Sequence, residues 1–192
     1  RYRGLDRNRD PIEKWVETSQ RYQSILIKSH IEAFRRYKYK PFNGAIMFHF
    51  SDNYPGINWS IVDYWKKPKP AYYEVQRAFR PVHVMLGWNK AKCAEDVFAS
   101  EVYVVNDLQC SYDGSRITWK LQDPDGEIIG QGDFKVDIGP DCCILVGTAK
   151  CPLPSAMKLG EYKVTLELKD KEGNILSDNF YHFAIGASKS FF

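Results

Sequence analysis

The spacing of hydrophobic residues divides the chain into a helical part and a strand-rich part. Between residues 10 and 38, apolar side chains recur at steps that keep them on one helical face, which predicts a long amphipathic helix. The expected apolar face carries Trp15, Tyr22, Leu26, Ala33 and Tyr37. Asp10, Pro11 and Glu13 form a capping signature at the start. Pro41 ends the helix, because the residue before a proline is pushed out of the helical region.

The next run, Gly44 to Phe50, is short, almost continuously apolar and bounded by turn-forming residues. This pattern predicts a buried strand of the parallel type, covered on both faces. A loop rich in aromatic residues and turn formers follows as far as Lys69, and a short helix is expected from Ala71 to Phe79. Together these elements form part of an α/β unit without neighbouring strands for its sheet.

After Pro81 the pattern becomes one of short strands separated by turn signals. The expected strands are Val82–Leu86, Glu101–Val105, Arg116–Leu121, Gly132–Val136, Cys142–Val146, Tyr162–Leu168 and Asn179–Ala184. Seven short strands in about 105 residues are typical of an immunoglobulin-like β-sandwich. Two hairpins share one motif, in which Gly126 and Gly173 are expected to supply positive φ angles. We therefore expect one domain over residues 1–80 and a second over residues 81–192.

Composition places the chain among folded globular proteins, with 44% hydrophobic and 15% aromatic residues. The net charge of +3 hides a basic half, +9 over residues 1–90, and an acidic half, −6 over residues 91–192. A basic, aromatic-rich half could bind nucleic acid. Much of its charge, however, lies at Arg35, Arg36, Lys38 and Lys40, where the carbonyl end of the predicted helix favours cations. We expect a solvated helix end there and no nucleic-acid partner.

The sequence contains no apolar window long enough for a membrane span and no visible signal peptide. Because the first residue is not Met, we expect a processed or cut chain, and the location of the parent stays open. The five cysteines are odd in number and include no CxxC motif, so free thiols are expected, with a lean toward a reducing compartment such as the cytoplasm. No cofactor and no metal site are expected.

Two groups of polar residues are expected to be structural. The turn at Asp123–Gly126 offers carboxylate oxygens but lacks the further ligands of a calcium loop, so we expect a hairpin turn. His30, His83 and His182 are each isolated among apolar residues, which favours satisfied structural histidines over catalytic ones.

Candidate binding residues follow the apolar run that ends at residue 50. They are Phe48, His49, Asp52, Tyr54 and Trp59. In α/β barrels, ligands bind at the carboxyl ends of the strands. Flat rings suit sugar faces, and a carboxylate can accept hydrogen bonds from hydroxyls. The residues alone leave open that these rings only fill a core.

The same region of the chain resembles a known family. Residues 44–64, with the downstream motifs at 67–73 and 77–82, resemble the eighth strand and last helix of glycoside hydrolase family 2 barrels. The likeness is to the β-mannosidase and exo-β-glucosaminidase branch. Residues 19–24 and 35–38 are similar to that family's seventh barrel helix. The sandwich segments 104–107, 160–162 and 176–181 are similar to its carboxy-terminal immunoglobulin-like domain.

The resemblance implies a carboxy-terminal fragment of a (β/α)8 barrel (helix, strand, helix) followed by an all-β sandwich, within a retaining exo-β-glycosidase. Such enzymes use two carboxylates as nucleophile and acid/base. In the family these glutamates follow the fourth and seventh strands, and this chain begins after both. The remaining candidates, Glu13, Glu17, Glu32 and Glu74, fall on predicted helices. No catalytic residue is therefore assigned, and the chain alone is expected to be inactive.

The family's strand end usually reads Trp-Gln-x-Asn-Asp. Here the corresponding residues are Phe48, His49, Phe50, Ser51 and Asp52, so only the aspartate keeps the pattern. We expect a smaller aromatic platform and an altered sugar preference.

The expected partners are a β-linked carbohydrate, the remainder of the parent barrel and, through exposed barrel surfaces, a second copy of the chain. The alternative is a non-catalytic carbohydrate-binding or interaction sandwich. That alternative needs exposed aromatic residues, and Trp88 and Trp119 are the tryptophans available after Phe79.

Overall fold

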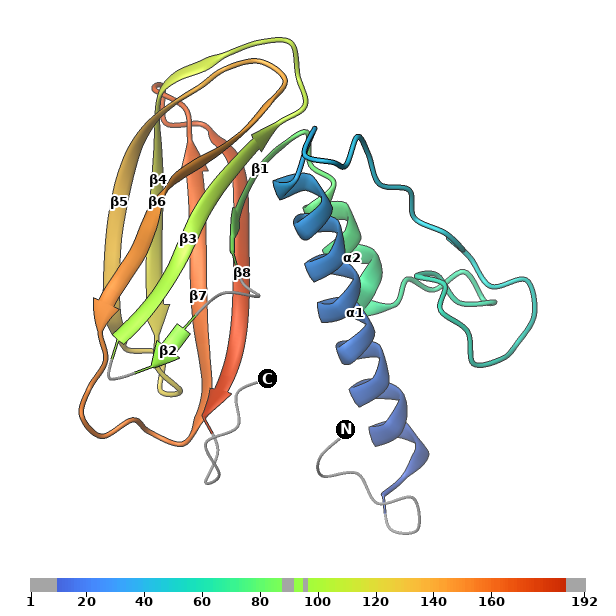
Figure 1. Ribbon diagram of the computed structural model, residues 1–192. Helices are drawn as coiled ribbons and strands as arrows, with labels where there is room; N and C mark the ends of the chain where they lie inside the picture. The colour runs from blue at the N-terminus through green and yellow to red at the C-terminus, as the bar shows by residue number, and fades with distance from the viewer. Residues whose placement is uncertain (1–9, 88–91, 95–96, 186–192) are drawn as a thin grey trace. The chain divides into compact units, whose positions relative to one another are not determined.

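The computed structural model describes residues 10–87, 92–94 and 97–185, which form two compact units (Figure 1). The helix–loop unit comprises residues 10–34 and 44–79. The sandwich unit comprises residues 35–43 and 80–185. The segment 35–43, which includes the last residues of the first helix, therefore belongs with the sandwich.

The helix–loop unit is built on two helices, α1 (Ile12–Arg36) and α2 (Pro70–Ala78). Both agree closely with the predicted helices, although α1 begins and ends two residues inside its predicted bounds. Pro70 occupies the first turn of α2, where its missing N–H has no helical partner to lose. A small apolar core joins the helices to the loop between them. Its buried members are Ile31, Ile61, Val62, Ala71, Val75 and Ala78.

The buried side of α1 differs from the predicted apolar face. Ser24, Lys28 and Glu32 are buried, whereas Tyr22 and Leu26 of the predicted face are exposed. The reason lies in α2, where Glu74 meets the Lys28 ammonium at 3.2 Å and so draws a polar side of α1 inward. The long apolar side of α1 is consequently left at the surface.

The predicted strand Gly44–Phe50 is not formed in the isolated chain. The segment has no strand assignment, and Ile46, Phe48 and Phe50 are 96%, 74% and 58% exposed. A strand of the parallel type needs hydrogen-bonded neighbours on its edges. Among the described residues, the nearest substitute is one isolated bridge between Ser51 and Val62. Apolar character alone did not make a strand here.

The sandwich unit contains two antiparallel sheets of four strands each among the described residues. The strands are β1 (Val82–Leu86), β2 (Lys92–Ala94), β3 (Val97–Asn106), β4 (Tyr112–Gln122), β5 (Ile128–Ile138), β6 (Cys142–Pro152), β7 (Gly160–Lys169) and β8 (Ile175–Ile185). One sheet has β3 between β6 and the edge formed by β1 and β2, and the other has the order β5-β4-β7-β8. All seven predicted strands are present, and β2 is an additional short one. The prediction of an immunoglobulin-like sandwich is confirmed.

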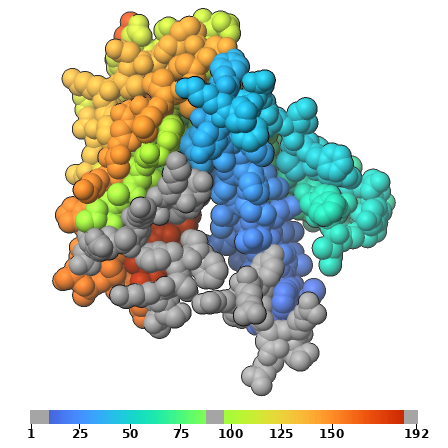
Figure 2. All heavy atoms as spheres, viewed as in Figure 1, coloured from blue at the N-terminus to red at the C-terminus, as the bar shows by residue number. Residues whose placement is uncertain are grey.

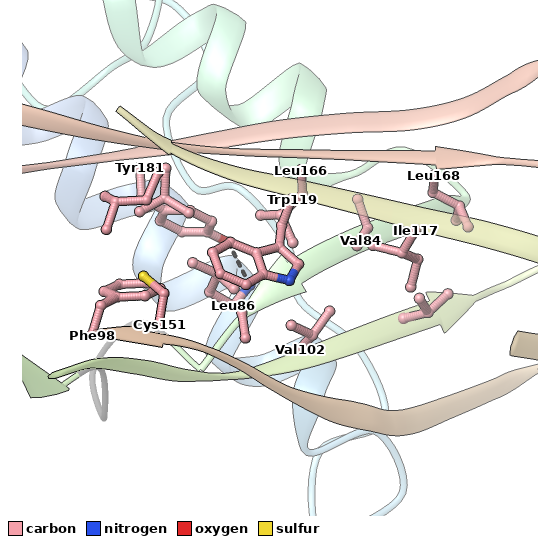
Figure 3. Close-up of a cluster of buried hydrophobic side chains, with 14 of the residues drawn as sticks. Val84, Leu86, Phe98, Val102, Ile117, Trp119, Cys151, Leu166, Leu168 and Tyr181 are labelled. Atoms are coloured by element: carbon pink, nitrogen blue, oxygen red, sulfur yellow. Dashed lines mark hydrogen bonds between the residues drawn. The ribbon is translucent and has the colours of Figure 1, made fainter. Parts of the chain in front are cut away.

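Alternating burial along the long strands supplies the core between the sheets, as in β7, where every second residue from Tyr162 to Leu168 is buried. Figure 3 shows the ring of Trp119 among aliphatic side chains from both layers. Phe183 stacks on Phe98, with ring centroids 6.3 Å apart, and on Tyr162 at 5.2 Å. The core of the sandwich is the larger of the two hydrophobic cores described.

The two similar hairpins adopt the predicted turns. In the β4–β5 turn the N–H of Asp123 donates to the Glu127 carbonyl at 2.9 Å, and in the β7–β8 turn Asp170 donates to Asn174 at 3.0 Å. Gly126 and Gly173 have φ angles of 85° and 92°, a region that side chains disfavour. The shared motif is therefore one turn used twice.

The basic end of α1 is not the solvated end that the sequence predicts. Arg35 and Lys38 are mostly covered, and both donate to Asp107, each at 2.7 Å. Lys38 also lies 2.6 Å from Asp141, which accepts from the Tyr39 hydroxyl at 2.7 Å. Acids distant in sequence thus neutralise the cations of segment 35–43, a contact that a local charge pattern cannot reveal.

Of the cysteines, Cys110, Cys142, Cys143 and Cys151 are free thiols. Burial raises the pKa of the Cys143 thiol to about 11, which keeps this thiol protonated and unreactive at neutral pH. Within the described ranges, neither helix is both long and apolar enough to cross a membrane.

Candidate functional site

The loop between residues 50 and 69 folds back on itself and brings distant residues together. Asp52 N donates to the Val62 carbonyl at 3.0 Å, and Val62 N donates to the Phe50 carbonyl at 3.0 Å. On the other side, Lys69 N donates to the Ile61 carbonyl at 2.9 Å. Residues 61 and 62 therefore lie between the two outer segments, and they fix Asp52 and Lys69 relative to each other.

The side chains of Asp52 and Lys69 form a buried ion pair. Lys69 Nζ lies 3.0 Å from Asp52 Oδ2, and their side chains are 10% and 2% exposed, respectively. Lys69 Nζ also donates to the Ser60 hydroxyl at 3.1 Å. The Ser60 hydroxyl and the Lys69 ammonium hold the pKa of the Asp52 carboxyl below its usual range, although burial acts to raise it. Asp52 is therefore an anion at neutral pH.

This pair lines a cavity of about 810 Å³ in the helix–loop unit. Gln20 and Gln23 of α1 contribute one side, and Gln23 Nε2 fixes the loop by donating to the Trp59 carbonyl at 2.8 Å. Four aromatic rings of the loop line the cavity while staying more than 40% exposed: Tyr54, Trp59, Tyr64 and Trp65. In Figure 2 the loop, in teal, stands at the surface beside the blue helix α1. A charged group and several rings around one cavity of this size suit a small polar ligand with an apolar face.

The structure brings three of the five predicted site residues together. Asp52, Tyr54 and Trp59 line the cavity, whereas Phe48 and His49 are exposed and are not among its lining residues. The rings of Phe48 and His49 instead contact each other edge to face, with centroids 4.3 Å apart.

Sequence reasoning missed Lys69, Trp65 and Gln23. Lys69 stands between two prolines and reads as a turn residue, and Gln23 reads as an ordinary helical position. No local signal separates Lys69 from Lys66 and Lys67, which lie in the same aromatic and turn-rich loop. Its distance to Asp52 depends on how residues 61 and 62 are paired, which no local pattern encodes.

None of the glutamates that the structure describes lines the cavity. Glu74 of α2 pairs with Lys28 and with Arg77, the latter at 2.7 Å, and Glu32 is 1% exposed within α1. Glu13 and Glu17 lie on the first turns of α1 and are not among the residues that line the cavity.

No metal centre is evident in the part of the chain that the structure describes, where no three acidic, histidine or cysteine side chains are clustered suitably. The turn at Asp123 is occupied by an ammonium, because Lys158 Nζ lies 2.6 Å from both Asp123 and Asp125. His83, fully buried, lies 3.3 Å from both Ser177 Oγ and Asn179 Nδ2, as expected of a structural histidine.

The sandwich offers little of what a carbohydrate-binding module needs. Trp119 is 4% exposed and belongs to the core, so its ring cannot stack on a ligand. Trp88, the other tryptophan on which that alternative depends, lies outside the described residues. Among the described residues, the sandwich therefore offers a ligand no tryptophan ring.

Comparison with known proteins adds a family match for the sandwich. Residues 99–184 match the model of the Mannosidase Ig/CBM-like domain family. A stretch of 41 residues is 51% identical to β-mannosidase B of Aspergillus niger, and a stretch of the same length is 44% identical to β-mannosidase B of Emericella nidulans. Each stretch is 21% of the present chain and 5% of the protein that it matches.

Solved structures share the fold over most of the chain. A β-D-mannosidase from Dictyoglomus thermophilum superposes with a TM-score of 0.70 and 24% identity, covering 91% of this chain and 20% of that one. An exo-chitosanase from Amycolatopsis orientalis gives a TM-score of 0.68 and 20% identity, with 91% and 20% covered. The chain thus spans about a fifth of the length of these solved proteins.

Proposed function

Because the chain corresponds to the carboxy-terminal portion of a glycoside hydrolase family 2 protein, in the β-mannosidase and exo-β-glucosaminidase branch, we propose that it completes a retaining exo-β-glycosidase. In this proposal the parent hydrolyses the O-glycosidic bond of a terminal β-mannoside. Residues 1–80 supply the closing helix, strand and helix of its (β/α)8 barrel, and residues 81–192 supply a scaffold sandwich.

The observation that carries the proposal is the cavity around Asp52. It contains a buried carboxylate and exposed rings on the loop that follows the apolar run 44–50. In a barrel, that loop lies at the carboxyl end of a strand, where substrates bind. Asp52, Tyr54 and Trp59 are accordingly assigned to the substrate side of the site, and Phe48 and His49 join it once the run 44–50 pairs as a strand.

The proposal also explains what the isolated chain lacks. A retaining glycosidase needs two carboxylates about 5 to 5.5 Å apart, one as nucleophile and one as acid/base. The glutamates of the helix–loop unit are on helices, and Glu74 is already held by two cations. Both catalytic groups are therefore assigned to the remainder of the barrel, and the 192-residue chain alone is expected to hydrolyse nothing.

A chimera tests the proposal. The structurally equivalent carboxy-terminal fifth of the Dictyoglomus thermophilum β-D-mannosidase is replaced by this chain, and hydrolysis of p-nitrophenyl β-D-mannopyranoside is measured. We expect activity from the chimera and none from the 192-residue chain alone. Proton NMR of the released sugar is expected to show the β-anomer first, which identifies retention.

Two controls make the result interpretable. The relative truncated at the same junction must be inactive, since otherwise its own residues account for the hydrolysis. The chimera must also elute as a folded species with a cooperative melting transition. A folded chimera that cleaves no β-mannoside and no other aryl β-glycoside would rule the proposal out.

A further inference from the structure

The two carboxylate oxygens of Asp52 are in different situations. Oδ2 accepts from Lys69 Nζ at 3.0 Å. Oδ1 is buried and has no hydrogen-bond partner among residues 10–87, 92–94 and 97–185. A buried acceptor without a partner costs free energy, so such an atom is expected to meet a donor in the working state of the protein.

We infer that Lys69 is a positioning residue, which holds the Asp52 carboxylate so that Oδ1 accepts a hydroxyl group of an uncharged pyranoside in the cavity. The inference deepens the proposed function and rests on it, because it names the substrate class of the same site. Lys69 touches no substrate in this arrangement and acts through Asp52.

The surroundings of Lys69 explain how the carboxylate is held. The ammonium has three donors, and the structure uses them on Asp52 Oδ2 at 3.0 Å, the Ser60 hydroxyl at 3.1 Å and the Asn58 carbonyl at 3.3 Å. The backbone N–H of Lys69 is fixed by Ile61 at the same time. With its donors taken, Lys69 has no free N–H to offer a ligand, and Oδ1 of Asp52 is the atom of this ion pair that still lacks a hydrogen-bond partner.

The charges select an uncharged donor. The ammonium of Lys69 cancels the charge of Asp52 at a distance of 3.0 Å in a buried position. The ammonium group of an amino sugar at Oδ1 would be brought close to the Lys69 ammonium, and the carboxylate of a uronic acid would be repelled by Asp52. Like charges cost most where water is excluded. A hydroxyl donor carries neither penalty.

The rings account for the rest of a pyranoside. Tyr54, Trp59 and Trp65 line the same cavity and are 56%, 68% and 68% exposed. Their faces can cover the C–H side of a sugar ring, while Oδ1 orients one hydroxyl. The cavity volume of about 810 Å³ lies within the range of small-molecule sites and accommodates one or two sugar units.

The selectivity is tested by titrating methyl β-D-mannopyranoside, methyl β-D-glucosaminide and methyl β-D-glucuronide into the 192-residue chain at pH 7. Intrinsic fluorescence sums over all five tryptophans, Trp59 and Trp65 included, so ¹H–¹⁵N spectra are used to locate the shifts. We expect saturable binding of the mannoside in the millimolar range and binding of both charged sugars that is weaker by about tenfold or more. Equal affinity for the glucosaminide would overturn the selectivity for an uncharged ligand.

The positioning role is tested with Lys69→Met and Lys69→Arg. We expect Lys69→Met to weaken mannoside binding by about tenfold and Lys69→Arg to restore most of it. Lys66→Met is the matched control, because Lys66 lies in the same loop but donates to Ser51 Oγ at 3.0 Å. If Lys66→Met weakens binding as much as Lys69→Met does, the effect is general to the loop and the assignment of Lys69 fails.

A pH profile separates positioning from a merely structural effect. The groups that shift the titration of Asp52 are Ser60, Lys69 and His49, and Lys69 favours the ionised form. Without Lys69 the Asp52 carboxyl therefore protonates at a higher pH, and mannoside binding by Lys69→Met is expected to fall earlier on acidification than wild-type binding. Superimposable pH profiles would contradict the role.

Asp52→Asn covers the case in which Lys69→Met fails to fold. The amide keeps the shape of the carboxylate but removes its charge, and mannoside affinity is expected to drop about tenfold. Unchanged affinity in a folded Asp52→Asn variant would overturn the inference. The outcomes are also distinguishable from those of the chimera. Absent sugar binding with an active chimera rejects this inference alone, whereas sugar binding with a folded, inactive chimera rejects the proposed hydrolysis.

Discussion

The Nζ atom of Lys158 lies 2.6 Å from Oδ2 of Asp123, and this contact closes the turn between β4 and β5 from the side. The other oxygen, Oδ1, accepts the backbone N–H groups of Asp125 at 3.0 Å and of Glu127 at 2.9 Å. Both oxygens of a nearly buried carboxylate are therefore satisfied in the ionised form. Lys158, followed by these backbone groups, holds the pKa of the Asp123 carboxyl below its usual range.

A depressed pKa makes Asp123 a source of acid sensitivity. The stabilisation is present above the unfolded-state pKa of about 3.9 and is lost as the pH falls through the lower pKa of the folded state. We expect Asp123→Asn to lower the free energy of unfolding at pH 7, and its difference from wild type to shrink below about pH 4. Urea unfolding followed by circular dichroism between pH 2.5 and 7 would measure both. Asp133→Asn is the control, because Asp133 forms only a half-exposed pair with Arg116 at 3.0 Å. Parallel curves for wild type and Asp123→Asn would be inconsistent with the depressed pKa.

Gly147 leaves room for the ring of Phe134, so the stability of the sandwich is expected to be sensitive to a single added methyl group at this position. A Cβ at position 147 of β6 would lie 2.8 Å from Cε1 of Phe134 on β5, nearer than side-chain carbons normally come. Gly147→Ala is expected to cost about 1 to 3 kcal/mol, since overpacking forces the ring off its rotamer. Gly139→Ala is the matched control, because a Cβ there meets nothing within 4 Å and the substitution reduces unfolded-state entropy. Thermal melts should show a lower melting temperature for Gly147→Ala and an unchanged or higher one for Gly139→Ala. Equal losses of melting temperature would show that the residues around Gly147 move to accept the methyl group.

Strands β1 and β8, which belong to different sheets, are joined through polar side chains. Asn179 Nδ2 lies 2.9 Å from both the Val84 carbonyl and the Tyr181 hydroxyl, while Tyr181 accepts the N–H of Leu86 at 3.0 Å. Asn179→Ala leaves buried groups without their donor and is expected to cost about 1 to 3 kcal/mol. Gln131→Ala, which removes an exposed amide from β5, is expected to change little. Chemical denaturation gives both values, and a loss below 0.5 kcal/mol, roughly the size of a surface effect, would show that water replaces the amide.

The elements that sequence alone predicted well are those whose cause is local. The strands of the sandwich are recognisable from alternating apolar and polar residues, as in Tyr162–Leu168. The turns are recognisable from Gly126 and Gly173, whose positive φ angles most side chains disfavour. Strand glycines such as Gly132 give no such signal. Their need for space is visible only when Trp119 of the neighbouring strand is placed, with Nε1 2.8 Å from a Cβ at residue 132.

The candidate site was predictable only in part for the same reason. Asp52, Tyr54 and Trp59 are close in sequence and of suitable chemistry, so a local argument found them. Lys69 reaches Asp52 across the pairing of residues 61 and 62, and its importance depends on a 3.0 Å distance that only the folded loop creates. The cations Arg35 and Lys38 were misjudged likewise, because their acids lie about 70 to 100 residues away.

Residues 44–50 form no strand in the isolated chain, so a charged substitution there is expected to act differently in the isolated chain and in a complete barrel. In the isolated chain Ile46 is 96% exposed, and the segment presents apolar side chains to water. Ile46→Lys should therefore leave the melting temperature unchanged and lower both hydrophobic-dye binding and self-association at high concentration. Leu145→Lys on β6, at 56% exposure, is the control for adding a charge to an isolated surface position.

In the chimera with the Dictyoglomus thermophilum enzyme, the same Ile46→Lys change is expected to be strongly harmful. If residues 44–50 pair there as the closing strand of a barrel, that strand is covered on both faces and the side chain at position 46 is buried. Burying an unpaired ammonium costs about 3 kcal/mol or more. Melting temperature and β-mannoside hydrolysis should both fall, while Leu145→Lys stays neutral in both contexts. A chimera indifferent to Ile46→Lys would mean that the segment remains outside any barrel. Persistent self-association of the isolated variant, measured by sedimentation, would instead point to a second copy that contacts the chain elsewhere.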